Sequence, residues 1–365
     1  MIWVLLGLCA LGFVLLRRVP RCPEAPFSGT PVRVSLIVPA RNEEANLERL
    51  LATVAAQSLP FQEVLVVDDA STDRTADVAR GHGATVHAAP ELPEGWRGKA
   101  WACQHGANVS TGGAMLFLDA DTTLTPDAHE RIQAAYAVGE RRAVSLGPYH
   151  DVERPYEELS AIFNLMTFMG LGAFSLFGSP DDPRGLFGPF LLIDRAAYDE
   201  AGGHEAVRGE ILEHMTMCGL LRERGVRMWC GGGRGVVHTR MYPDGPASLV
   251  EGWTKAFAAG ASKTEPGTLF LTVLWMTGGM LAFFLPAFSP WLSFLSPWLG
   301  LAYLAYAVTT LVLLRRIGRF AVWSSALYPV LMVAFFVIFS RSARLRRSGG
   351  QVTWKDRSID AGQPG

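Results

Sequence analysis

Long apolar segments without charge near the C-terminus constrain this chain most strongly. No charged side chain occurs from Thr268 to Leu314, and none occurs from Phe320 to Ser340. A helix that crosses a membrane needs about 20 consecutive apolar residues, so the first stretch is long enough for two spans and the second for one. We therefore predict a transmembrane region over residues 268–340 with two or three segments, followed by a basic polar tail over 341–365.

A shorter apolar run opens the sequence. Residues 2–16 are apolar, arginines follow them, and no small-residue cleavage site is evident, which favours a membrane anchor over 1–19 rather than a signal peptide. The arginines place the following chain in the cytoplasm. Three further crossings would then put the arginines of the tail on the opposite side. A re-entrant or interfacial last segment would avoid this conflict, and the sequence leaves the choice open.

Composition narrows the class of protein. Hydrophobic residues make up 49% of the chain and charged residues 18%, against about 25% charged in typical soluble domains. The formal net charge of −1 gives no basic field for nucleic acid, so no nucleic-acid partner is expected. Five scattered cysteines without a CxxC pair support neither a disulfide framework nor a zinc site.

Between residues 31 and 265 the pattern changes to alternating short apolar runs and amphipathic segments. Such alternation predicts an α/β domain with a mostly parallel sheet. The expected elements are a strand over 32–38, a helix over 43–57, strands over 63–67 and 84–88, a helix over 99–107 and a strand over 114–118. Ligands bind at the carboxyl ends of the strands in such sheets, and acidic clusters follow two of these strands.

The acidic clusters suggest a metal and a nucleotide site. Asp119 and Asp121 are separated by one residue after an apolar strand, and two such carboxylates suit Mg²⁺ or Mn²⁺ bound to a diphosphate. A pair of this kind alone is common in solvated turns, but Asp68 and Asp69 at another strand end favour a functional site. The sequence contains neither GxGxxG nor GxxxxGK[ST], so a dinucleotide fold and a P-loop lose their main support.

Taken in order, four segments resemble glycosyltransferase family 2. They are Val34–Glu43 with Pro39-Ala40-Arg41-Asn42-Glu43, Val67–Asp73, Gly98-Lys99 and Asp119-Ala120-Asp121. The resemblance covers roughly residues 32–240 and implies the GT-A fold, an α/β domain with a mostly parallel sheet that binds nucleotide-diphosphate sugars. The fold prediction is therefore a GT-A catalytic domain over 31–265 with N- and C-terminal transmembrane helices.

The resemblance also implies roles on the donor side. Pro39, Ala40, Arg41 and Glu43 would line the uridine pocket. Asp69 would face the base with Asp68 beside it, and Lys99 would lie near the nucleotide. Asp119 would face the ribose and the metal, and Asp121 would be the direct ligand of Mg²⁺ or Mn²⁺.

On the acceptor side the chain departs from the family pattern. Many members carry Glu-Asp where this chain has Glu213 and His214, and in them the aspartate is the general base. On a helix, Glu210 would share a face with Glu213 and His214, so all three are candidate bases. A histidine can serve because its usual pKa is about 6.5. The choice among the three stays open.

A later segment distinguishes a subgroup. Arg240, Trp253 and Lys255 lie where related membrane enzymes carry a QxxRW element that contacts diphosphate and acceptor. This version, together with Gly95–Lys99, is similar to the membrane-bound carotenoid-acid (diaponeurosporenoate-type) glycosyltransferases. Arg240 and Lys255 would offset the charge of the leaving group, and Trp253 would stack on a sugar or lie at the membrane interface.

The sequence thus predicts an inverting, metal-dependent glycosyltransferase of the cytoplasmic membrane with its catalytic domain in the cytoplasm. It would move a hexose, glucose by preference, from a UDP-sugar to a lipid-soluble acceptor such as a carotenoid acid or alcohol. An interfacial helix at about 159–178 would guide the acceptor. Alternatives are a processive polysaccharide synthase, a polyprenyl-phosphate, hopanoid or glycerolipid glycosyltransferase, and a degenerate nucleotide-sugar-binding subunit without catalysis.

Overall fold

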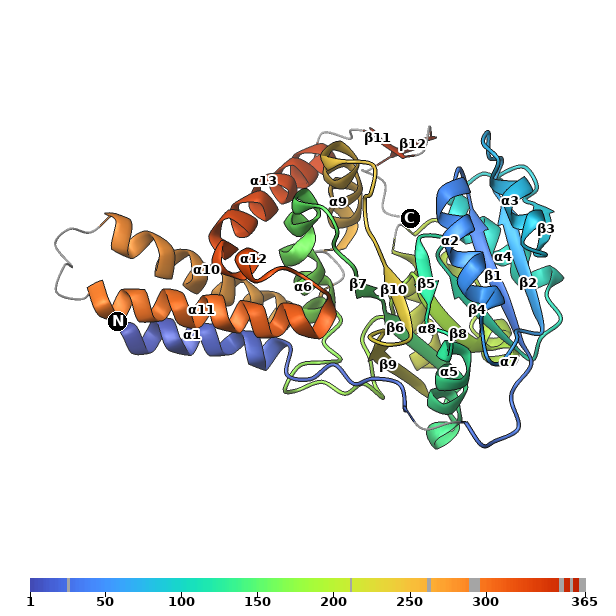
Figure 1. Cartoon of the computed structure of the whole chain (residues 1–365), viewed down its shortest axis with the longest axis horizontal. Coiled ribbons are helices and arrows are strands. Elements are labelled where there is room, and N and C mark those ends of the chain that lie inside the picture. The colour runs from blue at the N-terminus through green and yellow to red at the C-terminus, as the bar shows by residue number, and fades with distance from the viewer. Residues whose placement is uncertain are drawn as a thin grey trace. The chain divides into compact units, whose positions relative to one another are not determined.

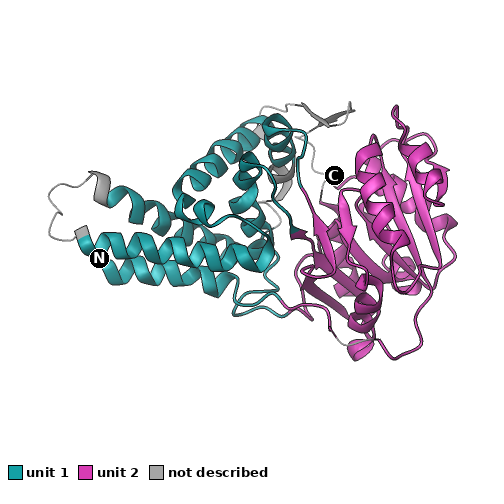
Figure 2. Cartoon of the chain, in the orientation of Figure 1, with its two compact units in different colours: residues 1–19, 150–179, 241–363 teal, residues 20–149, 180–240, 364–365 magenta. Residues whose placement is uncertain are grey.

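The computed structural model describes residues 1–24, 27–210, 212–260, 264–288, 296–347, 351–354 and 357–360. The chain divides into two compact units (Figure 2). We call them the helical unit, formed by residues 1–19, 150–179 and 241–363, and the α/β unit, formed by residues 20–149, 180–240 and 364–365. Residues 289–295, in the middle of the charge-free stretch from Thr268 to Leu314, lie outside the described residues.

A seven-stranded sheet in the order β3–β2–β1–β4–β8–β6–β9 organises the α/β unit (Figure 1). Its strands are β1 Val34–Ala40, β2 Glu63–Asp68, β3 Thr85–Ala88, β4 Ala114–Leu118, β6 Ala143–Gly147, β8 Phe190–Asp194 and β9 Met228–Gly232. β8 is antiparallel to β4 and β6, whereas the other neighbouring pairs are parallel. The predicted mostly parallel sheet is confirmed. A second sheet has the order β5–β10–β7, with β5 Thr122–Leu124, β10 Val237–Thr239 and β7 Tyr149–His150.

Helices cover both faces of the sheet. They are α2 Glu44–Ala55, α3 Thr75–Gly81, α4 Gly98–Val109, α5 Ala128–Ala137, α7 Arg195–Glu200 and α8 Glu213–Glu223, with 3-10 turns η1 Val138–Glu140 and η3 Glu205–Val207. Alternate residues of a strand face opposite sides, so Leu36 packs in the same core as Leu47 of α2. Ile37 points to the other side, where Gly106 of α4 lies so close that a Cβ would meet it at 2.5 Å.

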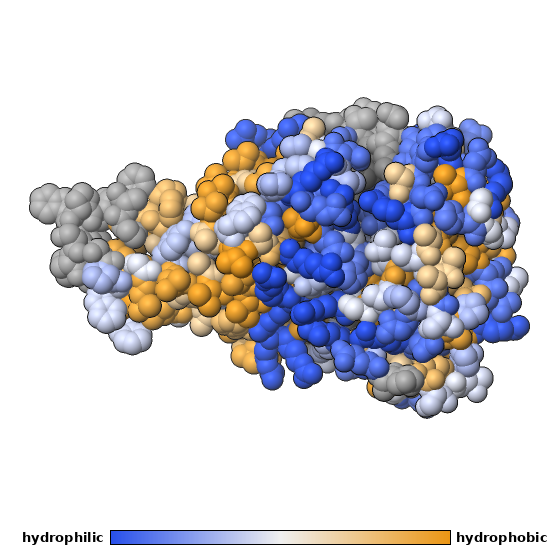
Figure 3. Space-filling model, in the orientation of Figure 1, coloured by the Kyte–Doolittle hydropathy of each residue, from blue (hydrophilic) through white to orange (hydrophobic). Residues whose placement is uncertain are grey.

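The helical unit contains the predicted apolar segments. Its elements are α1 Ile2–Leu15, η2 Pro155–Ser160, α6 Ala161–Gly170, α9 Pro246–Gly260, α10 Pro266–Phe288, α11 Ser296–Ile317, α12 Val322–Ala326 and α13 Tyr328–Arg347, followed by the strands β11 Gln351–Trp354 and β12 Arg357–Asp360. Three described helices are long and apolar enough to cross a membrane: Pro266–Leu285, Pro297–Ile317 and Tyr328–Leu345. Hydrophobic residues gather on the surface of this unit (Figure 3), as expected of a membrane-associated protein.

The predicted interfacial helix over 159–178 is shorter in the structure. It corresponds to η2 and α6, and α6 ends at Gly170. Nearly all side chains of α6 are buried, and the helix contacts α10, α11 and α13. The structure thus places α6 inside the helical unit, and its position at a membrane surface stays a prediction.

Candidate active site

Strand order brings the predicted donor-side residues to one edge of the sheet. β1 pairs in parallel with β2 on one side and β4 on the other, so the carboxyl ends of all three strands lie together. Pro39 and Ala40 end β1, Asp68 ends β2, and Asp119 directly follows β4. This is the edge at which open α/β sheets bind ligands.

Two loops at this edge are held in unusual conformations. Asn42, after β1, has φ 52°, and Ala70, after β2, has φ 54°. A residue with a side chain adopts such left-handed angles at a cost of about 1 kcal/mol or more, and these outliers cluster at binding sites. Arg41 links the loops, because its guanidinium donates to the carbonyl oxygens of Asp69 at 2.7 Å and Ala70 at 3.3 Å. The carboxylate of Asp68 accepts from the backbone N–H of Ser71 at 3.1 Å.

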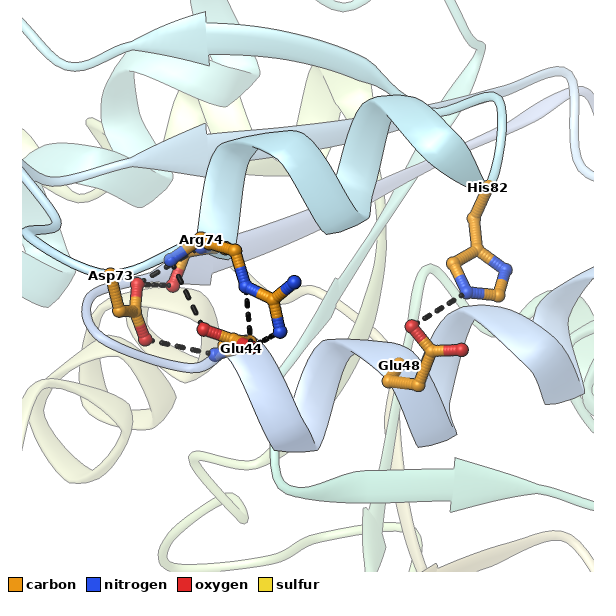
Figure 4. Close-up of polar contacts among 6 residues, drawn as sticks. Glu44, Glu48, Asp73, Arg74 and His82 are labelled. Atoms are coloured by element: carbon orange, nitrogen blue, oxygen red, sulfur yellow. Dashed lines mark hydrogen bonds and ion pairs between the residues drawn. The ribbon is translucent and has the colours of Figure 1, made fainter.

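A polar brace supports these loops from the side of α2 and α3 (Figure 4). Asp73 accepts from the backbone N–H groups of Glu44 at 3.2 Å and of Thr75 at 2.9 Å. The guanidinium of Arg74 in turn binds the Glu44 carboxylate. The first turns of both helices are thereby fixed to each other. Glu43 directly precedes α2, and Asp69 lies in the loop that leads to α3.

A half-buried ionic cluster lies at the end of β4. The ammonium of Lys99, in the first turn of α4, is 2.6 Å from a carboxylate oxygen of Asp119 and 3.6 Å from one of Glu213. It also donates to the carbonyl oxygen of Gly188 at 3.2 Å. Burial alone would lower the pKa of Lys99, but the two carboxylates raise it above its usual value, so Lys99 is a cation at neutral pH.

The two adjacent candidate bases, Glu213 and His214, differ in charge. Burial works to raise the pKa of Glu213, yet the charge of Lys99 lowers it, so this residue is a carboxylate. Burial lowers the pKa of His214, and Glu213 only partly opposes this, so its imidazole is neutral. The Nδ1 atom of His214 is buried without a hydrogen-bond partner. A neutral imidazole with a nitrogen unpartnered can accept a proton or a hydrogen bond.

Several of these residues line a single cavity in the α/β unit. Its polar lining includes Lys99, Asp119, His204, Glu213 and His214, and Pro39 and Gly188 also line it. Gly188 is required there, because a Cβ at this position would lie 2.7 Å from Nδ1 of His214. The close approach of Gly188 to His214 depends on tertiary structure, because the two residues are far apart in the sequence.

The helical placement expected for Glu210 was wrong. α8 begins at Glu213, and Leu212 before it has the non-helical angles φ −113° and ψ 66°. Glu210 therefore precedes the helix and does not share its face with Glu213 and His214. The cavity is not lined by Glu210, and its role as a base stays a prediction.

The cavity lining does not include Asp121, Arg240, Trp253 or Lys255. Thr239 of β10 pairs with Thr122 of β5; Arg240 directly follows Thr239, and Asp121 directly precedes Thr122. Trp253 and Lys255 lie on α9 of the helical unit. The Trp253 indole is buried, donates to the Ser160 hydroxyl at 3.0 Å and stacks on a phenylalanine ring. Contact of Trp253 or Lys255 with a substrate stays a prediction.

The carboxylates of Asp119 and Asp121 suit a metal ion that also binds oxygen atoms of a substrate. Asp119 and Asp121 offer carboxylate oxygens, the ligands that hard divalent cations prefer. Within the described residues, no group of three or more His, Cys, Asp or Glu side chains is arranged to hold a metal ion. Two carboxylates suit an ion that completes its shell with phosphate oxygens and water, as Mg²⁺ does. All five cysteines are free and buried.

Comparisons with known proteins agree with this geometry. A family model described as glycosyl transferase family 2 matches residues 35–200. The chain is 36% identical over 335 residues to a 4,4'-diaponeurosporenoate glycosyltransferase of Staphylococcus haemolyticus, with 90% of this chain and 89% of that relative aligned. It is 35% identical over 330 residues to the protein of the same name from Staphylococcus aureus strain MRSA252, with 89% and 87% aligned.

A solved structure has the same fold. It is a mannosyltransferase from Pyrobaculum calidifontis, determined in complex with GDP-Man and Mn²⁺. The two share 18% sequence identity with a TM-score of 0.51, over 95% of this chain and 98% of that one. This likeness supports the GT-A fold.

Proposed function

Because the chain belongs to glycosyl transferase family 2 and is a glycosyltransferase, we propose that it transfers glucose from UDP-glucose to the carboxyl group of a carotenoid acid in the cytoplasmic membrane. The relatives named diaponeurosporenoate glycosyltransferase support an acceptor of this kind. The observation that carries the proposal is the cluster of Lys99, Asp119, Glu213 and His214 around one cavity at the carboxyl end of the sheet.

The donor binds across the sheet edge in this proposal. The loops after β1 and β2 hold the uridine, with Arg41 and Asp69 fixed to each other beside it. Asp119 and Asp121 would hold Mg²⁺ or Mn²⁺, and the ion would supply positive charge that offsets the diphosphate leaving group. Arg240, which directly follows the Thr239–Thr122 pair of β10 and β5, adds positive charge near Asp121.

A carboxylate acceptor would explain why this chain has His214 where many family members carry an aspartate. A carboxylate acceptor is already a nucleophile, so its oxygen attacks the anomeric carbon without losing a proton. The bond from that carbon to the diphosphate breaks, and the diphosphate leaves with the electron pair, which inverts the configuration. An aspartate at position 214 would repel the acceptor carboxylate, whereas the neutral imidazole of His214 does not. Lys99 offsets the charge of Glu213 in the same wall.

A transfer assay tests the proposal. Membranes containing the protein receive UDP-glucose, Mg²⁺ or Mn²⁺, and a carotenoid acid or the alcohol of the same carotenoid. Mass spectrometry should find the acid heavier by one hexose, and Asp121→Asn should abolish the product. Asp77→Asn, which changes an exposed aspartate of α3, is the matched control and should leave activity intact. Absence of any glycosylated lipid with all UDP-sugars, despite UDP binding, would refute the proposal.

A second variant tests the role of His214. His214→Asp restores the residue that many family members carry. If the neutral imidazole serves a carboxylate acceptor, the variant should transfer glucose less efficiently to the acid and more efficiently to the alcohol. An unchanged acid-to-alcohol ratio would contradict this explanation while leaving the glycosyltransferase activity itself standing.

A further inference from the structure

Contacts among α1, α10 and α11 show the directions in which these three helices run and which of their residues lie at the same level. Cys9 of α1 contacts Thr309 of α11 at 3.2 Å, and Arg316 near the end of α11 donates to the backbone carbonyl of Leu16. α1 and α11 therefore run parallel and finish together. α10 runs the opposite way, since Gly12 lies against Trp275 and Leu8 lies against Gly278.

Arginines mark the end at which α1 and α11 finish. This group, the arginine end, consists of Arg17, Arg18, Arg315, Arg316 and Arg319. Positive charge gathers on the cytoplasmic side of membrane proteins. The chain enters the α/β unit at residue 20, shortly after α1 ends at Leu15.

From the arginine end the chain turns back into the bundle. Gly318 pairs with His150 in a β-bridge, and Arg319 donates to the carbonyl oxygen of His150 at 2.8 Å. After α12, the rings of Tyr328 and Tyr306 stack with centroids 5.9 Å apart. The Tyr328 hydroxyl donates to the Gly279 carbonyl of α10 at 3.0 Å.

The level of Tyr306 gives the depth of this turn. The part of α11 from Tyr306 to Ile317 is roughly 16 Å long at about 1.5 Å per residue. Half of a hydrocarbon core of about 30 Å is about 15 Å. α13 therefore begins near the middle of the membrane and not at either surface.

α13 then returns toward the arginine end. Met332 still lies against Gly279 of α10. Further on, the ring of Phe335 packs on Phe163 of α6 at 4.9 Å, and the Ser342 hydroxyl donates to the Thr254 carbonyl of α9 at 2.6 Å. α9 precedes the start of α10, and that start is the cytoplasmic end of α10.

We propose that α12 and α13 form a re-entrant hairpin that enters and leaves the membrane from the cytoplasmic side. The chain then crosses the membrane with α1, α10 and α11 alone. The exposed apolar side chains Val330, Val333, Phe336 and Val337 contact the acyl chains of the cytoplasmic leaflet. A spanning α13 would instead start at the arginine end and finish beside Phe288, at the far end of α10.

The hairpin also removes the conflict in charge. The four arginines of the C-terminal segment, Arg341, Arg344, Arg346 and Arg347, come to lie in the cytoplasm with the arginine end. The positive-inside rule is then satisfied on every segment. This inference concerns membrane topology and does not depend on the donor or the acceptor.

A depth profile tests the hairpin in the full-length protein. Single cysteines at positions 330, 333, 337 and 344 carry a nitroxide in lipid vesicles, while the native cysteines are all buried. Accessibility to oxygen relative to a water-soluble nickel complex should fall steadily from position 330 to position 344. A profile that peaks near position 337 and falls on both sides would overturn the proposal. Nitroxides at Val308 and Val312 of α11 calibrate the depth scale, since both side chains are exposed.

Labelling of the C-terminal tail provides an independent readout. In sealed spheroplasts, Ser348→Cys should resist a membrane-impermeant maleimide and react after permeabilisation. Ser289→Cys, between α10 and α11, should react in sealed spheroplasts and is the matched control. Reaction of position 348 in sealed spheroplasts would place the tail outside and refute the hairpin.

Discussion

Replacing Lys99 with methionine tests whether the ionic cluster stabilises the α/β unit. At an effective dielectric constant of about 20, unit charges attract by about 6 kcal/mol at the 2.6 Å to Asp119 and about 5 kcal/mol at the 3.6 Å to Glu213. The Lys99 side chain is 37% exposed, so solvent screening and the cost of desolvation cancel most of this attraction. We expect Lys99→Met to destabilise the protein by about 2–3 kcal/mol.

Thermal unfolding of the purified protein in detergent measures this change. A loss of about 2–3 kcal/mol corresponds to a fall in Tm of roughly 5–10 °C for a domain of this size. Arg80→Met is the matched control, because Arg80 pairs with Asp77 at the surface, where the side chains are 61% and 77% exposed. We expect the control to change stability by less than about 0.5 kcal/mol.

A double variant separates charge from packing. Adding Glu213→Gln to Lys99→Met removes one of the two carboxylates left without a cation, and it should recover part of the lost Tm. If Lys99→Met lowers Tm no more than Arg80→Met does, the electrostatic reasoning is refuted. The reasoning is also refuted if Glu213→Gln lowers Tm in the Lys99→Met background by as much as it does in the wild type.

Three further predictions follow from individual contacts. Gly188→Ala should lower kcat several-fold with a smaller effect on Tm, because its Cβ would lie 2.7 Å from Nδ1 of His214 and would displace that ring. An unchanged kcat would contradict a role for the His214 ring in turnover. Burial works to raise the pKa of Glu63, but hydrogen bonds outweigh it and lower the pKa, so its stabilising effect is present above the unfolded pKa of about 4.3 and is lost at lower pH. The Tm difference between the wild type and Glu63→Gln should therefore shrink from pH 6 to about pH 3, as the pH falls through the lowered pKa of Glu63 in the folded state, and a constant difference would contradict this linkage. Trp253→Phe should cost about 1 kcal/mol in thermal unfolding, since it removes the buried hydrogen bond to Ser160, whereas an unchanged Tm would show that this bond contributes nothing.

The donor half of the site could be predicted from the sequence because its signals are local. Apolar strands that end in Asp68 and Asp119 need only the rule that parallel strands share a carboxyl edge. The position of Lys99 next to Asp119 is consistent with the motif order. The acceptor side was less predictable, because the start of α8 depends on Leu212, which leaves Glu210 off the helix.

Hydropathy by itself determined which segments are apolar enough for a membrane, since that property is a sum over neighbouring residues. It could not determine how the last segment is placed, because a charge-free stretch suits a spanning helix and a re-entrant one equally. The proposed re-entrant placement rests on tertiary contacts: Tyr328 meets Gly279 and Ser342 meets Thr254, residues far apart in the sequence. In the same way, the neutral state of His214 arises from burial beside Gly188, and burial is a property that only the folded chain has.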